Sequence, residues 1–483
     1  MEAPMFTIDR STSSSATPLV DHVLRLVDAS RPTRVDARVW TRVRILTLGS
    51  LIALGRHTLT QLLVAIGAGD LDWSAWYRTF NRDRFQLDRG RLVILREVLR
   101  SCGADAPLVV VVDATQAPRS SRRFPGVGAT RAPRCPVWRP GVHLAQRIEI
   151  VSGLMARTET GESRAVPLQA TVLRTSRTQP FETVPEQTEA EGATRLLARV
   201  RDDLAVLGEP NRRLLVLGDG AYSTAPVLRN LPERTGLLAR CAKNRALFAR
   251  PVQVPGHRGR RRLYGERGPT PQEQVTGPGP WRTVSFAVRG RRVTPRVCVT
   301  GPWLVKPVPD HPLFLIVVKG VKRGRGLTRR QRASHFFLVS AASDDTGTPV
   351  LPLPVTELLA WAWQRWEVEV MHRELKSSCG FGDQQAWSSL GAARTLEWTL
   401  WTYALLILTG VAVWGLGPAP GPDLGRWWRP RRWSVGRLLQ AIRAELWQVV
   451  DLSPGLRRTP DAWAEMETWI TTRTSAALGI RHI

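Results

Sequence analysis

The stretch LVVVVDAT, residues 108–115, places an aspartate, Asp113, directly after five apolar residues. A short apolar run rich in valine predicts a buried strand. A second run of this kind, Leu214–Leu217, leads into Gly218 and Asp219. Ligands of open α/β sheets bind beyond the carboxyl ends of the strands, so both aspartates are candidate site residues at strand ends. One such aspartate is more often a turn residue or a helix cap, but two in one sheet favour a function.

The segments around these two runs alternate between strand-like and helix-like patterns. Further strands are predicted at Val142–Leu154, Arg164–Val172 and Gly236–Cys241. Helices are predicted at Glu186–Leu207 and Ala225–Leu231. The order β-β-β-α-β-α-β predicts an α/β fold with a mixed sheet flanked by helices.

The rest of the chain divides by composition. The α/β domain is predicted to cover residues 105–249 and 346–415, with a β-rich insertion, rich in Gly, Pro and Arg, at 250–345. Residues 19–104 and 416–483 are predicted to form helical N- and C-terminal regions. The Ser- and Thr-rich residues 1–18 are predicted to be a disordered tail.

Two short helices in the N-terminal region, Thr60–Ile66 and Ser74–Asn81, flank a Gly-containing turn at 67–70. The second helix carries Trp76 and Arg78. This pattern resembles a helix-turn-helix that reads DNA. It is equally typical of a helical hairpin packed for stability, and both interpretations stay open.

The bulk composition indicates a packed protein with a polyanionic partner. Hydrophobic residues make up 43% of the chain, and the formal net charge is +28. Nucleic acid is the first candidate for a partner, although charge can also serve solubility alone. The five cysteines form no CxxC pair, and the N-terminus has no signal-peptide pattern, so we expect a cytoplasmic protein without a zinc site or disulfides. The uncharged run Trp398–Trp414 is predicted to be a buried core helix and not a membrane span.

A third carboxylate stands out in the segment WQRWEVEVMHRELK, residues 363–376, within a long helix predicted from Val355 to Leu375. Four charged residues share one helical stripe at i, i+4, i+8 and i+11: Arg365, Glu369, Arg373 and Lys376. Glu367 and Glu374 fall on other sides. A solvated ladder of ion pairs has the same pattern. The apolar neighbours Trp366 and Val370 favour a helix packed on the sheet, with the stripe in a cleft.

Three carboxylates, Asp113, Asp219 and Glu369, suit Mg²⁺ or Mn²⁺, which prefer oxygen ligands. Two ions about 3.5–4 Å apart would activate a water or a 3′-hydroxyl and stabilise the leaving oxygen of a phosphodiester. Lys376 and Arg365 would hold the phosphates of the scissile strand, and no catalytic histidine is required.

Three basic clusters are candidate contacts to the DNA backbone. Seven arginines and no acidic residue lie between Arg119 and Arg147, and a second cluster lies at 258–262. A third runs from Lys322 to Arg332. The named candidates are Arg119, Arg122, Arg123, Arg323 and Arg325. Solvated loops without a partner have the same composition.

Together these motifs resemble the DDE transposases of bacterial insertion sequences, over roughly residues 40–445. Asp113 and Asp219 match the two aspartates of that family. Arg365, Glu369 and Lys376 match its Tyr-x2-Arg-x3-Glu-x6-Lys motif, with Ala362 in the place of the tyrosine. The resemblance implies an RNase H-like catalytic domain, and the β-rich insertion is similar to that of the insertion-sequence-four superfamily.

The resemblance further implies a metal-dependent DNA transposase that uses two Mg²⁺ or Mn²⁺ ions. It would bind terminal inverted repeats as a homodimer, cleave, and join the ends to target DNA in the bacterial cytoplasm. Thr115 and Tyr222, which follow the two aspartates, and Arg373 are expected beside the DNA. Trp281 and Trp303 are candidates to stack on a flipped base, although packing in a β-core is commoner. The alternatives are a non-catalytic DNA-binding protein derived from a transposase, and an RNase H-like nuclease without strand transfer.

Overall fold

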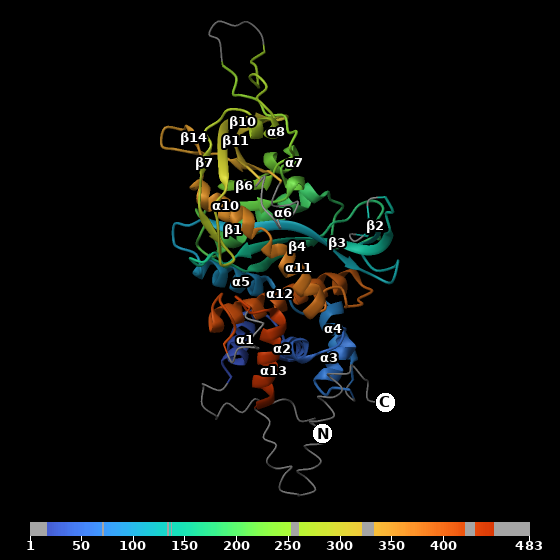
Figure 1. The fold of residues 1–483 in the computed structure, drawn as a ribbon. Coiled ribbons are helices and arrows are strands. Elements are labelled where there is room, and N and C mark those ends of the chain that lie inside the picture. Colours follow the sequence, from blue (N-terminus) through green and yellow to red (C-terminus); the bar gives the residue numbers. More distant parts are fainter. Residues whose placement is uncertain are drawn as a thin grey trace, which may run out of the picture.

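The computed structural model describes residues 17–69, 72–132, 135–136, 138–252, 260–320, 333–420 and 430–448 (Figure 1). Most of the predicted tail lies outside these residues. So does the basic cluster that contains Arg323 and Arg325.

The centre of the molecule is a mixed sheet. Its five central strands are β1 (Leu108–Pro118), β3 (Val142–Leu154), β4 (Ala165–Val172), β5 (Leu214–Gly218) and β6 (Thr235–Arg240). β5 runs parallel to β1 and β6, whereas β3 runs antiparallel to both β1 and β4. The resulting order β4-β3-β1-β5-β6 confirms the predicted α/β fold and is consistent with an RNase H-like domain. The sequence did not reveal β2 (Val127–Arg131), which pairs with β3 at the edge.

The strands of the 250–345 region continue this sheet. They are β12 (His335–Ser340), β11 (Val308–Val318), β10 (Arg296–Val305) and β7 (Arg282–Thr283), in that order after β6. The junction is the antiparallel pairing of β12 with β6, in which Val339 lies opposite Leu238. Smaller elements are α8 (Pro271–Thr276) and the hairpins β8 (Phe286–Val288) with β9 (Arg291–Val293) and β13 (Ala342–Ser343) with β14 (Pro349–Val350). The region is thus joined to the α/β domain by an unbroken ladder of backbone hydrogen bonds.

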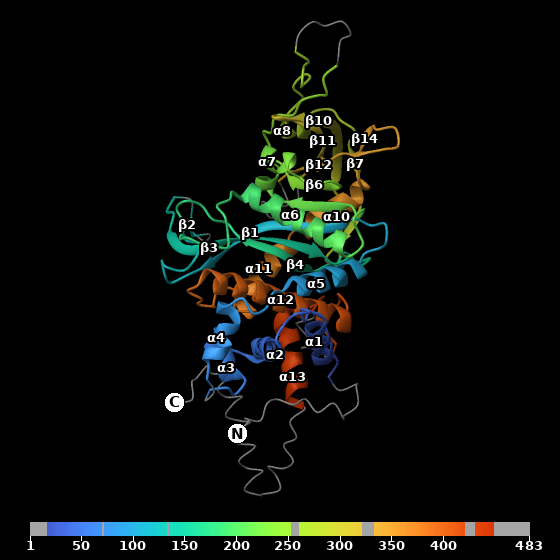
Figure 2. The ribbon, with the colours of Figure 1, turned by 180° about the vertical axis from the view of Figure 1, so that it is seen from behind.

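Helices cover both faces of the central strands. α6 (Glu189–Val206) lies over one face and α11 (Glu367–Ser378) over the other (Figures 1 and 2). α6 begins at a capping box formed by Thr188 and Glu191. The short helix α7 (Ala225–Arg229) follows β5.

The prediction of one long helix from Val355 to Leu375 is wrong, because two helices occupy this segment. α10 (Val355–Gln364) ends before Arg365, and α11 begins at Glu367. Between them the backbone changes to tighter i→i−3 hydrogen bonds. The amide of Trp366 donates to the carbonyl of Trp363, and the amide of Glu369 donates to the carbonyl of Trp366. The tighter turn changes the direction in which the side chains of α11 point.

The remaining helices form one bundle below the sheet (Figure 1). They are α1 (Pro18–Ala29), α2 (Ala37–Ile52), α3 (Leu59–Ala65), α4 (Ser74–Asn81), α5 (Asp88–Arg100), α12 (Ser389–Trp414) and α13 (Val435–Gln448). Glu445 of α13 accepts hydrogen bonds from the first backbone amides of α1, those of Leu19 and Val20. Trp40 of α2 packs edge-to-face on Trp401 of α12, with ring centroids 6.3 Å apart. The two ends of the described chain therefore share one core.

α12 is the one helix in the described part of the chain that is long and apolar enough to cross a membrane. Its most apolar 18-residue window has a mean hydropathy of 1.5, but 72% of that window is buried inside the structure. Trp398 donates a hydrogen bond to Thr47, and Trp401 one to Ser30, so both indole N–H groups find partners in the bundle. These contacts are those of the core helix that the sequence predicted.

Candidate active site

Asp113 lies on β1, and Asp219 directly follows the adjacent parallel strand β5. β1 and β5 pair as far as Val111 opposite Leu217, and each aspartate follows two residues later. The prediction that Asp113 ends its strand is wrong, because β1 runs on to Pro118. What ends near Asp113 is the pairing with β5, while the pairing with β3 continues. The two aspartates therefore lie at one level, where β1 and β5 separate.

Each aspartate uses one carboxylate oxygen locally. Oδ1 of Asp113 accepts a hydrogen bond from the amide of Ala114 at 3.0 Å. Oδ1 of Asp219 accepts one from Ala221 at 2.8 Å and begins the short helix η1 (Gly220–Tyr222). Asp219 is thus a helix cap as well as a candidate site residue, and the two roles are compatible because a carboxylate has two oxygens.

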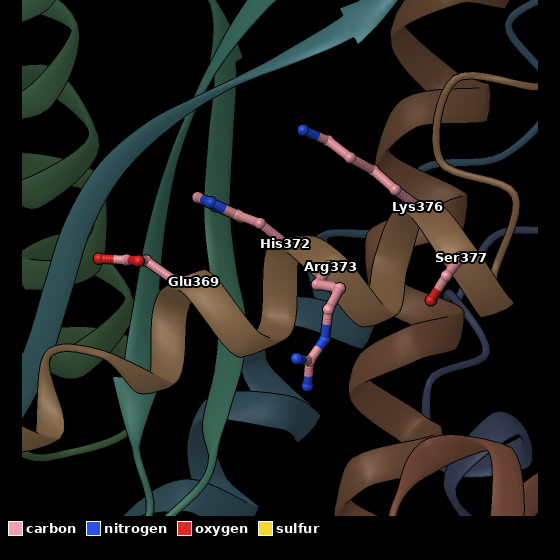
Figure 3. Close-up of a pocket in the computed structure, with 5 residues that line it drawn as sticks. All are labelled: Glu369, His372, Arg373, Lys376 and Ser377. Carbon is pink, nitrogen blue, oxygen red and sulfur yellow. The ribbon is translucent and has the colours of Figure 1, made fainter. Parts of the chain in front are cut away.

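α11 forms one wall of a cavity of about 480 Å³. Its lining residues are Glu369, His372, Arg373, Lys376 and Ser377. Figure 3 shows Glu369, His372 and Lys376 extending from one side of α11, while Arg373 and Ser377 point the other way. The predicted stripe therefore holds for Glu369 and Lys376, but His372 takes the place in it that was expected for Arg373.

Two contacts tie this helix to its surroundings. Nη2 of Arg365 lies 2.8 Å from Oε1 of Glu369. Nζ of Lys376 donates a hydrogen bond of 2.7 Å to Oγ1 of Thr115, two residues beyond Asp113 on β1. The structure thus brings together Arg365, Glu369, Lys376 and Thr115 at the strand that carries Asp113.

The pKa of Asp113 is raised to about 6, chiefly because the side chain is buried. The charge of Arg365 lowers that pKa, whereas the negative charges of Asp219 and Glu369 raise it. The three carboxylates therefore lie close enough to influence one another. An added cation would relieve their repulsion.

His372 was not singled out from the sequence. It is 8% exposed, and its Nδ1 lies 3.9 Å from Oδ2 of Asp113. Burial, and then the charges of Lys376 and Arg365, lower its pKa to about 3, so the imidazole is neutral. The signal in the sequence was its position three residues after Glu369, which puts it on the same side of a helix.

The two other glutamates of α11 have structural partners. Glu367 is 1% exposed and pairs with Arg289 at 2.6 Å and with Arg432 at 2.7 Å. Glu374 pairs with Arg164 at 3.3 Å and accepts a hydrogen bond from Tyr403 at 2.8 Å. Glu369 is therefore the glutamate of this helix that faces the cavity.

Two residues that were predicted to contact DNA, Tyr222 and Arg119, form hydrogen bonds with other groups of the protein. Tyr222 is 1% exposed, and its hydroxyl lies between two glutamates. The guanidinium of Arg119 donates to the carbonyls of Gly382 and Gln384 and to the side chain of Gln146. Neither side chain is presented to a ligand at the surface, because internal acceptors already occupy both. Arg122 and Arg123 are exposed.

The tryptophans expected near the DNA have packing roles. Trp303 fits over Gly268, where a Cβ would collide with its ring, and Nε1 of Trp303 donates to Thr300 at 3.0 Å. Trp281 carries Lys319 over its ring, at 4.9 Å from the centroid.

The two tryptophans beside Ala362, which stands where the family's motif has a tyrosine, contact other side chains of the protein. Trp361 is buried, with Arg157 stacked over it at 4.9 Å. Trp363 packs in an aromatic cluster with Phe286 and Phe337. Both rings pack against side chains around α10.

Within the described residues, no three His, Cys, Asp or Glu side chains are grouped tightly enough to form a ready metal site. Asp113, Asp219 and Glu369 nevertheless offer the oxygen ligands that hard divalent cations take. Glu369 is held by Arg365. The set fits a divalent ion in its chemistry, provided that Glu369 leaves Arg365 to bind it.

Comparison with known families agrees with this geometry. A family model described as DDE superfamily endonuclease matches residues 29–297, which is more than half of the chain. The match includes Asp113 and Asp219 and ends before Glu369. Among curated proteins, none matches the chain. The fold, the paired aspartates and the extent of this match show that the chain belongs to the DDE superfamily of endonucleases.

Proposed function

We propose that this DDE endonuclease is a DNA transposase, which cleaves at the ends of a mobile element and joins those ends to target DNA. The observation that carries the proposal is that three carboxylates, from β1, the end of β5 and α11, lie close enough for Asp219 and Glu369 to raise the pKa of Asp113, while Glu369 and Lys376 line one cavity. The formal net charge of +28 supports a polyanionic substrate.

Asp113, Asp219 and Glu369 are the residues that would hold the divalent ions, Mg²⁺ or Mn²⁺. When bound, such ions supply the Lewis acid and lower the pKa of the attacking water or 3′-hydroxyl. The protein's own part is to position these groups. The β1–β5 register aligns the two aspartates, and α11 brings Glu369 to them.

Cations of the site bind the phosphates. Lys376 is exposed and lines the cavity, and its bond to Thr115 directs it along β1. Arg365 is 13% exposed and faces Glu369. When Glu369 binds an ion, Arg365 becomes available to a phosphate oxygen, for which a guanidinium is well suited.

His372 holds a neutral imidazole against Asp113. Because the imidazole is uncharged near neutral pH, it adds no positive charge that would compete with a metal ion. Its ring also lines the cavity, with Nδ1 3.9 Å from Oδ2 of Asp113.

Transposition adds a second reaction to cleavage, so the test separates the two. A DNA fragment with a pre-cut 3′ end, supplied with a supercoiled target plasmid and Mg²⁺, should be joined to the target. Cleavage of intact ends without joining would favour a nuclease of the same family. Binding without any metal-dependent nicking would favour a non-catalytic DNA-binding protein.

The remaining parts of the proposal concern partners and location. The DNA would be the terminal inverted repeats of the element and its target. Two ends must be held together, so a homodimer is proposed for the joined complex. The reaction would take place in the bacterial cytoplasm, at the nucleoid.

A further inference from the structure

A second acidic cluster lies behind the candidate active site, on the opposite face of the sheet. Glu149 of β3 is 0% exposed and lies across from Ala114, the neighbour of Asp113. Successive side chains of a strand point to opposite faces, so Glu149 points away from the cavity and toward α6. A Cβ at Gly192 of α6 would collide with Oε2 of Glu149, so this glycine makes room for the carboxyl group.

Tyr222 connects this cluster to the turn that carries Asp219. Its hydroxyl oxygen lies 3.0 Å from Oε1 of Glu149 and 3.0 Å from Oε1 of Glu189. Its ring packs on Gly218, where a Cβ would lie 2.8 Å from the Cβ of the tyrosine. The residues on both sides of Asp219 are thereby fixed against the buried carboxyl group of β3.

The number of protons in the cluster limits which of its groups can donate hydrogen bonds. A phenol has one proton, so it can donate to only one of the two glutamates. The second contact needs a proton from a carboxylic acid. Glu189 forms an ion pair with Arg147. Glu149 forms no ion pair with any described residue and is buried, and burial raises its pKa to about 8.

The groups that face Glu149 act on its charge in both directions. Glu189 of α6 and Asp113 of β1 disfavour a negative charge on Glu149. The hydrogen bond with Tyr222, from the turn after β5, and the charge of Arg147, two residues away on β3, favour that charge, but burial disfavours it and is the largest effect. The proton therefore belongs on Glu149.

We propose that neutral Glu149 donates to Tyr222, that Tyr222 donates to Glu189, and that this chain of hydrogen bonds holds the Asp219 turn level with Asp113. Glu149 and Tyr222 are then positioning residues for the acidic site. The inference rests on the proposed function in one respect, since it takes Asp113 and Asp219 to be the metal-binding pair.

The direct test is Mn²⁺ binding to the full-length protein without DNA, measured by the electron paramagnetic resonance of free Mn²⁺. Tyr222→Phe keeps the ring and removes the hydroxyl, and we expect it to weaken Mn²⁺ binding by about tenfold. Tyr403→Phe is the matched control, because it also removes a phenol bonded to a buried glutamate, Glu374. We expect the control to lose a similar amount of thermal stability and to bind Mn²⁺ like the wild type.

Substitutions of Glu149 test whether its carboxyl group carries a proton. In Glu149→Gln an amide N–H takes the place of the acid O–H, so Mn²⁺ affinity should stay near the wild-type value, whereas Glu149→Ala should weaken it like Tyr222→Phe. The wild type should also lose thermal stability relative to Glu149→Gln as the pH rises toward 8, because the folded protein keeps a proton on Glu149 that the unfolded chain has already released.

Opposite results would overturn the inference. If Tyr222→Phe binds Mn²⁺ like the wild type, the cluster is only a packing feature. If Glu149→Gln and the wild type change stability with pH in the same way, Glu149 is ionised. Failure of the proposed function looks different, because Asp113→Asn and Asp219→Asn would then bind Mn²⁺ as tightly as the wild type.

Discussion

Arg365 and Glu369 form an ion pair, with Nη2 and Oε1 2.8 Å apart, across the junction between α10 and α11. The pair links the end of one helix to the first turn of the next. It also gives Glu369 a cationic partner. A metal ion at the acidic site would therefore compete with Arg365 for the carboxylate of Glu369.

Removal of Arg365 is expected to favour metal binding and to impair catalysis. In Arg365→Gln, Glu369 loses the partner that competes with the ion, so Mn²⁺ affinity without DNA should rise by about two- to fivefold, the range for a partly exposed pair. The rate of DNA cleavage should fall, because a phosphate-binding cation is lost. Calorimetric titration with Mn²⁺ and a cleavage assay measure the two effects, and an unchanged or weaker Mn²⁺ affinity would speak against a competition between Arg365 and the ion.

Lys376 and Arg373 are expected to differ in their contribution to DNA binding, although both lie on α11. Lys376 extends beside Glu369, whereas Arg373 points the other way (Figure 3). Lys376→Gln should lower the slope of log affinity against log salt concentration by about one, the effect of one lost phosphate contact. Arg373→Gln serves as the control and should change the slope less. Equal slopes for the two variants would contradict this view of the helix.

Substitution of Glu374 is expected to lower the stability of the protein, whereas substitution of Glu369 is expected to affect its activity and not its stability. Glu374→Ala leaves Arg164, whose side chain is 3% exposed, without its partner, so the free energy of unfolding should fall by about 3–5 kcal/mol. Glu369→Ala removes a carboxylate that is 34% exposed and should change stability little. Chemical denaturation of both variants is the measurement. A larger loss of stability in Glu369→Ala would show that the roles are reversed.

His372 is expected to make the protein sensitive to acid. Its pKa is lowered to about 3 in the folded state, so the unfolded chain binds a proton more readily below its ordinary value of 6.5. The free energy of unfolding should therefore fall as the pH drops from about 6.5 toward 3. His372→Gln should reduce that fall, as measured by urea denaturation at a series of pH values. A pH dependence identical to that of the wild type would mean that His372 is not held in its neutral form.

The sequence predicted those parts of the fold that depend on local patterns. Apolar runs located β1, β3, β4, β5 and β6, because a buried strand needs several consecutive apolar residues. Helical spacing identified Glu369 over Glu367 and Glu374. Local patterns could not show that β1 continues past Asp113, since residues 114–118 pair with a strand more than twenty residues away.

Long-range contacts explain the other differences. Tyr222 and Arg119 were expected near DNA from their positions in the sequence, but their partners come from β3, α6 and the loop after α11. No proline or glycine lies at the break between α10 and α11, so the sequence does not indicate it. A pattern read along one segment contains none of this information.

The central claim is that Asp113, Asp219 and Glu369 form one metal-dependent cleavage site. The most direct measurement is the nicking of supercoiled plasmid DNA with Mg²⁺ or Mn²⁺ by three variants, Asp113→Ala, Asp219→Ala and Glu369→Ala, beside the exposed control Glu159→Ala. We expect each of the three to abolish cleavage and to retain DNA binding, while the control cuts like the wild type. Wild-type cleavage by all three variants would contradict the account.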